Sequence, residues 1–185
     1  MSVESRQEQS IDLGVTMNGT FAVLTLLLGM KEAYTDCQSE CLAKHEVQDR
    51  ISLSQGSLQF QGDVIGREVY VRYDSPHANG PFQAIYGASY SSLGDFWAGV
   101  GHSYTMKTGD FGLYAEVHAM TGIYVQGSGP DLGGPIEFRS GAEIGYQFPA
   151  GWRLAASYDH RSNAEIFALN PGVETVQVRL SKPLN

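Results

Sequence analysis

The stretch "FGLYAEVHAMTGIYV", residues 111–125, sorts its side chains with a period of two. One side would carry Leu113, Ala115, Val117 and Ala119, and the other would carry Tyr114, Glu116 and His118. Alternation of this kind is typical of a β-strand, because successive side chains point to opposite faces. Strands of globular proteins average about five or six residues, whereas a tilted transmembrane strand needs about nine to eleven. The stretch therefore predicts a strand that crosses a membrane.

The same alternation continues on both sides of this stretch, and short segments rich in Gly, Pro, Asn and Asp separate most of the runs, such as "SPHANGP" at 75–81. The candidate strands span residues 51–62, 66–74, 81–91, 95–107, 111–127, 136–148, 152–164 and 173–182. An even number of strands closes an antiparallel barrel and leaves no unpaired edge. We therefore predict an all-β fold, an eight-stranded antiparallel up-and-down β-barrel of the outer-membrane type. A soluble sandwich or lipocalin-like barrel, with the apolar face inside, would produce the same alternation.

Composition narrows the possible functions. The chain has 185 residues, enough for one domain with a core. Its 12 Lys and Arg stand against 20 Asp and Glu, a net charge of −8, and no basic cluster appears. Phosphate contacts need clustered Lys and Arg, so we predict no binding of nucleic acid. Trp97 and Trp152 are expected at the membrane interface.

The N-terminal fifty residues differ from the rest of the chain. The run "FAVLTLLLGM" at 21–30 is too short to cross a bilayer as a helix, but it fits the apolar core of a signal peptide. A buried strand or a short core helix is the alternative. We predict a leader or signal region at 1–35, a polar connector at 36–50 and the barrel domain at 51–185. The two cysteines, Cys37 and Cys41, either close a small loop or remain free thiols.

The segment "DHRSNAEIFALNPGVE", residues 159–174, places polar side chains on the apolar faces of the last two strands. Strands joined by a hairpin pair with each other, so His160 and Glu174 are expected to meet, with Ser162 on the same side. This is the order of a catalytic triad: the Ser hydroxyl attacks, the His accepts its proton and the Glu orients the imidazole. The next residue, Asn163, is placed to donate a hydrogen bond to an oxyanion. The hairpin therefore predicts a candidate site for nucleophilic catalysis by a Ser, His and Glu triad.

Two alternatives without catalysis remain open. A non-catalytic outer-membrane barrel would carry the same residues as a polar cluster at the membrane rim. A soluble β-barrel that binds a small apolar ligand would instead point His160 and Glu174 into a buried cavity.

The segment "HRSNAEIFALNPGVE" resembles the signature of the PagL-type lipid A 3-O-deacylases and the broader acyloxyacyl hydrolase group. In that family a His and a Ser stand two residues apart and a Glu follows fourteen residues after the His, and His160, Ser162 and Glu174 match this spacing. Asn163 matches the Asn of the family's oxyanion hole. The second donor is a backbone N–H three residues after the Ser, which here belongs to Glu165. The close resemblance covers residues 136–181, and the barrel pattern extends it to residue 51.

The resemblance implies an outer-membrane enzyme of a Gram-negative bacterium that removes the 3-linked acyl chain from lipid A by ester hydrolysis. Its partners would be lipid A or lipopolysaccharide and the lipids of the outer membrane. The implied triad needs no metal and no cofactor. An apolar outer wall is expected to hold the acyl chain; it would be made by Leu154, Ala156, Tyr158, Val176 and Val178.

Overall fold

The computed structural model describes residues 20–35, 41–107 and 111–184. Its helix is α1 (Thr20–Thr35). Its strands are β1 (Lys44–Glu46), β2 (Arg50–Phe60), β3 (Asp63–Asn79), β4 (Phe82–Ser91), β5 (Phe96–Lys107), β6 (Leu113–Val125), β7 (Ile136–Gln147), β8 (Arg153–Ser162) and β9 (Val173–Pro183). Each predicted strand therefore corresponds to an observed one.

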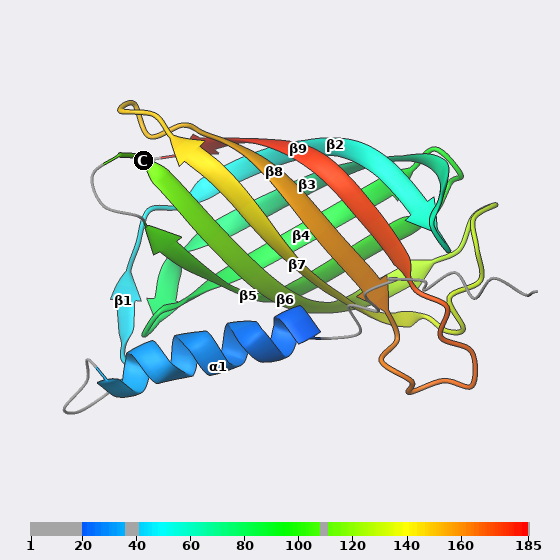
Figure 1. Cartoon of the computed structure of the whole chain (residues 1–185), viewed down its shortest axis with the longest axis horizontal. Helices are drawn as coiled ribbons and strands as arrows, with labels where there is room; N and C mark the ends of the chain where they lie inside the picture. The colour runs from blue at the N-terminus through cyan, green and yellow to red at the C-terminus, as the bar shows by residue number, and fades with distance from the viewer. Residues whose placement is uncertain (1–19, 36–40, 108–110, 185) are drawn as a thin grey trace, which may run out of the picture.

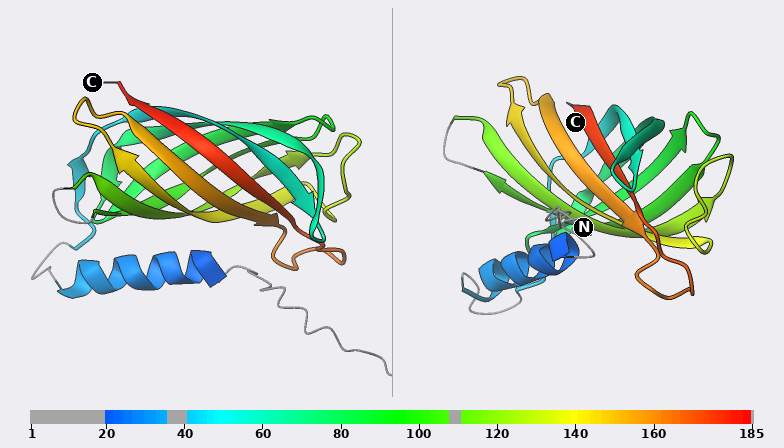
Figure 2. Two further views of the ribbon diagram at one scale, coloured as in Figure 1. Left: turned by 45° about the horizontal axis from the view of Figure 1, so that its top comes forward. Right: turned by 45° about the vertical axis from the view of Figure 1, so that its right-hand side comes forward.

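The strands form a closed barrel (Figure 1). From β2 to β9, each strand pairs antiparallel with its neighbour in the sequence, and β9 pairs back to β2. In the described part of the chain, β2 to β9 thus make an eight-stranded up-and-down barrel (Figure 2). The predicted fold class is confirmed. Closure gives every strand two partners, which is the condition for a sheet to stand in hydrocarbon.

The polar faces of the strands point into the barrel, as the alternation predicts. Arg139 lies at its centre, where its Nη2 atom contacts Glu68 Oε1 at 2.9 Å and Asp159 Oδ2 at 2.6 Å. Its guanidinium also lies 4.0 Å from the centre of the Tyr70 ring. Such a barrel interior is filled by side chains that satisfy one another, so the barrel has a packed polar core.

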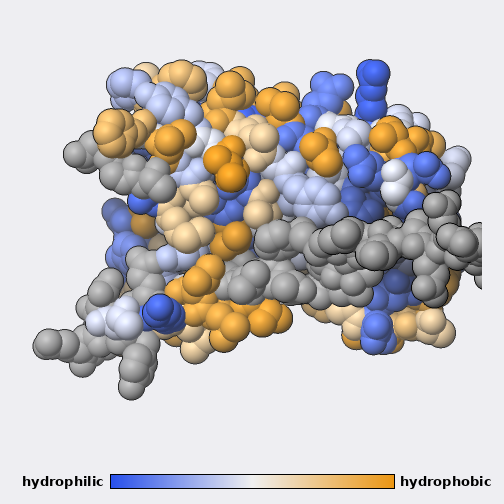
Figure 3. All heavy atoms as spheres, viewed as in Figure 1, coloured by the Kyte–Doolittle hydropathy of each residue, from blue (hydrophilic) through white to orange (hydrophobic). Residues whose placement is uncertain are grey.

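The outer wall is apolar (Figure 3). Large exposed hydrophobic side chains lie on it, among them Leu53, Val71, Val100, Ile123, Ile144, Val178 and Leu180. A wall of this kind matches the apolar band of outer-membrane barrels.

The prediction for Trp97 was wrong. Its side chain is fully buried inside the barrel, where it packs against Tyr70 with the ring centres 6.3 Å apart. Trp97 follows the outward-facing Phe96 in the chain, and the period of two turns it inward. Trp152, by contrast, is 39% exposed in the turn that leads into β8.

The prediction that residues 75–81 form a loop was also wrong in part. Strand β3 runs on to Asn79, and its register with β4 shifts between Asp74 and Ala78. Pro76 lies inside this irregularity, where a ladder N–H is not required. A proline signal therefore marked a bulge and not the end of a strand.

The N-terminal segment lies outside the barrel. Helix α1 packs along the outer surface over β5, β6 and β7 (Figure 2). The short strand β1, within the predicted connector at 36–50, pairs with the end of β3. Cys41 is disulfide-bonded, while Cys37 lies outside the described residues. No helix of the described residues has the length and hydropathy to cross a membrane. The leader assignment of 1–35 stays a prediction.

Candidate active site

The hairpin of β8 and β9 brings His160 and Glu174 together. The two residues are direct partners in the register, and His160 Nδ1 lies 3.1 Å from Glu174 Oε1. Their neighbours Asp159 and Thr175 are buried in the barrel interior, so His160 and Glu174 belong to the outer wall. With the proton on Nδ1, His160 donates to the carboxylate and keeps a lone pair on Nε2.

Ser162 lies on the same wall, two residues after His160, and both side chains line one cavity. Nε2 of His160 is buried and has no hydrogen-bond partner among the described residues. The Ser162 hydroxyl likewise has no hydrogen-bond partner among them. The structure therefore places His160, Ser162 and Glu174 on one part of the outer wall, and no hydrogen bond joins His160 Nε2 to the Ser162 hydroxyl.

The loop between β8 and β9, residues 163–172, covers His160. Although His160 faces the lipid side of the wall, its exposure is 6%. Gly172 packs against the ring, and a Cβ atom at this position would lie 2.7 Å from His160 Cε1. Its φ of +66° also favours glycine. The loop thus holds the imidazole against the barrel, which keeps Nδ1 on Glu174.

The turn after Ser162 is strained. Ala164 and Glu165 have φ values of +53° and +64°, a conformation that is uncommon for residues with a Cβ. Both residues line the cavity. Their backbone N–H groups have no partner among the described residues. Backbone strain of this kind is found at active sites, where surrounding contacts maintain it.

Asn163 points to the interior side and joins two loops. Its Nδ2 donates to the carbonyl oxygen of Leu132 at 2.7 Å and to that of Leu169 at 2.6 Å. Both amide hydrogens are therefore used, and the side chain is fully buried. To serve as an oxyanion donor, Asn163 would have to release one of these carbonyl groups. Its assignment to the oxyanion hole stays a prediction.

Asn170 lies in the site and was missed by the sequence analysis. It lines the cavity, and its Oδ1 accepts a hydrogen bond from the backbone N of Asn163 at 2.9 Å. Its Nδ2 has no partner among the described residues. The signal was present in the Asn-Pro-Gly sequence at 170–172, but it indicated a turn and no chemistry.

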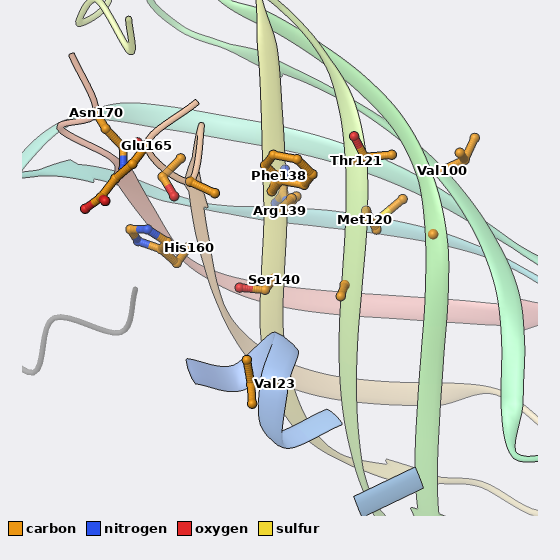
Figure 4. A pocket seen from close by; sticks show the side chains of 14 residues that line it. Val23, Val100, Met120, Thr121, Phe138, Arg139, Ser140, His160, Glu165 and Asn170 are labelled. Atoms are coloured by element: carbon orange, nitrogen blue, oxygen red, sulfur yellow. The ribbon is translucent and has the colours of Figure 1, made fainter. Parts of the chain in front are cut away.

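The cavity lined by His160 and Ser162 has a volume of about 600 Å³ and runs over the outer wall from β8 across β7 and β6 to β5. Figure 4 shows Glu165 and Asn170 next to His160, with Phe138 and Val100 farther along. Val23 of α1 lies on its outer side. The five residues expected to hold an acyl chain, on β8 and β9, do not line it. A cavity of this size suits a small apolar ligand.

Among the residues that the structure describes, no group of three or more His, Cys, Asp or Glu side chains could hold a metal ion.

Comparisons with known proteins agree with this architecture. A family model described as lipid A 3-O-deacylase (PagL) matches residues 54–183. The solved structure of the outer membrane enzyme PagL is similar at a TM-score of 0.60 and 16% identity, covering 73% of this chain and 99% of that one. A de novo designed transmembrane β-barrel (TM-score 0.54, 14% identity, 76% and 100% covered) and Neisserial surface protein A (0.52, 11%, 77% and 99%) share the fold. No curated protein matches the chain.

Proposed function

Because this chain belongs to the lipid A 3-O-deacylase (PagL) family, we propose that it hydrolyses the 3-position acyl ester of lipid A with a Ser162, His160 and Glu174 triad. It would be a serine carboxylic-ester hydrolase. The protein is an outer-membrane barrel of a Gram-negative bacterium, as predicted, and a lipid of that membrane is its substrate class.

The observation that carries the proposal is the contact of 3.1 Å between His160 Nδ1 and Glu174 Oε1 on the outer wall. A carboxylate and an imidazole exposed to hydrocarbon are costly, and a paired, loop-covered arrangement reduces that cost. A soluble barrel with an internal ligand would need these groups inside, whereas both face outward. A catalytic pair for a membrane lipid belongs on this side of the wall.

The chemistry follows from this arrangement. His160 Nε2 accepts the proton of the Ser162 hydroxyl as Oγ attacks the ester carbonyl. The tetrahedral intermediate collapses, and the imidazolium returns the proton to the departing sugar oxygen. Water then attacks the acyl-Ser162 ester with His160 again as the base, which releases the fatty acid and restores the hydroxyl. Glu174 stabilises the imidazolium in both steps, so each proton transfer is carried by groups of this chain.

The negative oxygen of the intermediate needs hydrogen-bond donors. We propose the Glu165 backbone N–H as one of them, since it lines the cavity and has no partner among the described residues. Asn163, predicted as the other, already donates to two carbonyl groups. This supports a positioning role for Asn163, and we propose Asn170 Nδ2, from a residue that lines the cavity, as the second donor.

The position of the loops supports a substrate in the outer leaflet. The connections at 126–135 and 163–172 lie at the same end of the barrel, joined through Asn163. The first strand of the barrel begins, and the last strand ends, at the opposite end of the barrel, where Arg50 pairs with Pro183. Longer loops are typical of the extracellular end of outer-membrane barrels, and the triad lies at that end.

The test is the release of fatty acid from purified lipid A by the full chain refolded in detergent. We expect Ser162→Ala to lower the release by at least about a thousandfold, because the triad acts as a unit. Ser157→Ala is the matched control, since Ser157 lies on the same strand but faces the barrel interior.

Release of a 3-hydroxy fatty acid by the parent and the control, and not by Ser162→Ala, would support the proposal. Equal background from all three folded proteins would contradict it and favour a non-catalytic barrel.

A further inference from the structure

The floor of the cavity is a row of residues that crosses the sheet. The register places His160 beside Ser140 and Ser140 beside Ala119, one residue on each of β8, β7 and β6. Neighbouring strands lie about 4.8 Å apart. An acyl chain that follows the row therefore crosses one strand with a few methylene groups. The row leads away from the triad through the small side chains of Ser140 and Ala119.

Ser140 is the polar member of this floor next to the triad. It faces outward with an exposure of 6%, and it lines the cavity together with Phe138 and Ala119. Its hydroxyl makes no hydrogen bond to a described residue. In Figure 4 its oxygen points to the side on which His160 lies.

A hydroxyl group in such surroundings needs a partner. A hydroxyl that faces an apolar cavity without a hydrogen bond is unfavourable. The cavity beyond Ser140 is lined by apolar groups such as Val100, so a purely aliphatic ligand would leave the hydroxyl unmatched. A ligand that carries a polar group near its reacting end would match it.

We propose that Ser140 is a specificity-determining residue that hydrogen-bonds a hydroxyl group on C3 of the acyl chain. This inference rests on the proposed function. Ser162 pairs with Phe138 and His160 pairs with Ser140, so Ser162 and Ser140 are diagonal neighbours. Diagonal neighbours are separated by roughly 7–8 Å, and somewhat less between their side chains.

This separation fits a 3-hydroxyacyl group. The carbonyl carbon lies next to Ser162 Oγ, two carbon–carbon bonds lead to C3, and its hydroxyl adds a hydrogen bond of about 2.8 Å. A hydroxyl farther along the row would lie over Ala119, which has no polar side chain; the other cavity hydroxyl on β6 belongs to Thr121, two residues away. The remaining methylene groups would continue over Ala119 toward Val100. The enzyme thus distinguishes 3-hydroxyacyl esters from unsubstituted esters of the same length.

The test compares two synthetic esters on the full chain in detergent, a glucosamine phosphate carrying 3-hydroxytetradecanoate and one carrying tetradecanoate at the same position. We expect Ser140→Ala to lower the ratio of kcat/KM for the hydroxylated over the plain ester by about five- to tenfold, the effect of one neutral hydrogen bond. Ser140→Thr keeps a hydroxyl and should retain most of the ratio. Hydrolysis of the tetradecanoate ester shows in each variant that the protein is folded.

An unchanged ratio in an active Ser140→Ala protein would overturn the inference, and so would an equal loss on both esters, which indicates a structural role. Hydrolysis by the parent that depends on Ser162, together with either of those results, would leave the proposed function intact. No Ser162-dependent hydrolysis of either ester would overturn the proposed function and this inference with it.

Discussion

At the scale of single residues, the assignment depends most on how Glu174 orients His160. The carboxylate contacts Nδ1 at 3.1 Å, which fixes the tautomer with a lone pair on Nε2. A glutamine at this position could bind the same nitrogen through its amide hydrogen and would then favour the wrong tautomer. It would also remove the negative charge that stabilises the imidazolium.

We therefore expect Glu174→Gln to lower kcat/KM by up to about 10⁴-fold, the loss found when a triad aspartate becomes an asparagine. The measurement is lipid A deacylation across pH, with folding followed by heat-dependent gel mobility. Glu165→Gln is a suitable comparison, because its side chain is exposed and its proposed role belongs to the backbone. Equal activity of the parent and Glu174→Gln would contradict the triad.

Gly172 is the second residue at which the site restricts the side chain. A methyl group there would approach His160 Cε1 to 2.7 Å, and the positive φ adds strain. We expect Gly172→Ala to lower kcat/KM by more than about tenfold as the ring is displaced from Glu174, measured on lipid A. Gly62→Ala separates the two causes, since Gly62 has a φ of +90° but open space where a Cβ atom would lie. If both variants kept full activity, the contact between loop and ring would not matter.

At the scale of elements, the position of the loop between β8 and β9 depends on the loop between β6 and β7. Asp95 holds the base of that loop, since its Oδ1 accepts the backbone N–H groups of Gly127 at 2.7 Å and Gly129 at 3.2 Å. Its Oδ2 accepts the Ser91 hydroxyl at 3.0 Å. Farther along the same loop, the carbonyl of Leu132 receives the Asn163 side chain. A change at Asp95 should therefore reach the site through this loop.

We expect Asp95→Ala to raise hydrogen exchange at the amides of Gly127 and Gly129 and to lower kcat/KM several-fold, because local opening becomes easier. Asp63→Ala is the matched control, since Asp63 is exposed at the start of β3. Exchange rates are measured by NMR in micelles. Unchanged protection at both glycines would show that Asp95 does not hold the loop.

At the scale of the whole molecule, the barrel depends on the charged network in its interior. Arg139 pairs with Glu68 and Asp159, and all three side chains are almost fully buried. Removal of one partner from a buried pair leaves an uncompensated charge, which costs about 3–5 kcal/mol. We expect Arg139→Met to lower the free energy of unfolding by about that amount, measured by urea titration in detergent. Arg67→Met, an exposed site, should change it little; an equal effect at both sites would contradict the prediction.

Much of this architecture could be predicted from the sequence, because alternation depends on neighbours in the chain. The inward position of Glu116 and the outward position of Ala119 follow from a period of two. The length of the same run predicted that the strand crosses a membrane. The pairing of His160 with Glu174 was also accessible, since consecutive strands joined by a hairpin are partners in an up-and-down barrel. Where the chain departs from regular pairing, as at Pro76, the local signal was ambiguous.

The sequence by itself determined the barrel strands, their two faces and the pairing of His160 with Glu174, since each depends on residues that are close in the chain or joined by one hairpin. The tertiary structure alone decided the rest: Trp97 inside the barrel, the bond from Asn163 to Leu132, Asn170 in the same cavity as Ser162, and the cavity floor through Ser140. These contacts join segments that are distant in sequence. Their positions depend on the closure and register of the barrel, and on loop packing that no short-range pattern encodes.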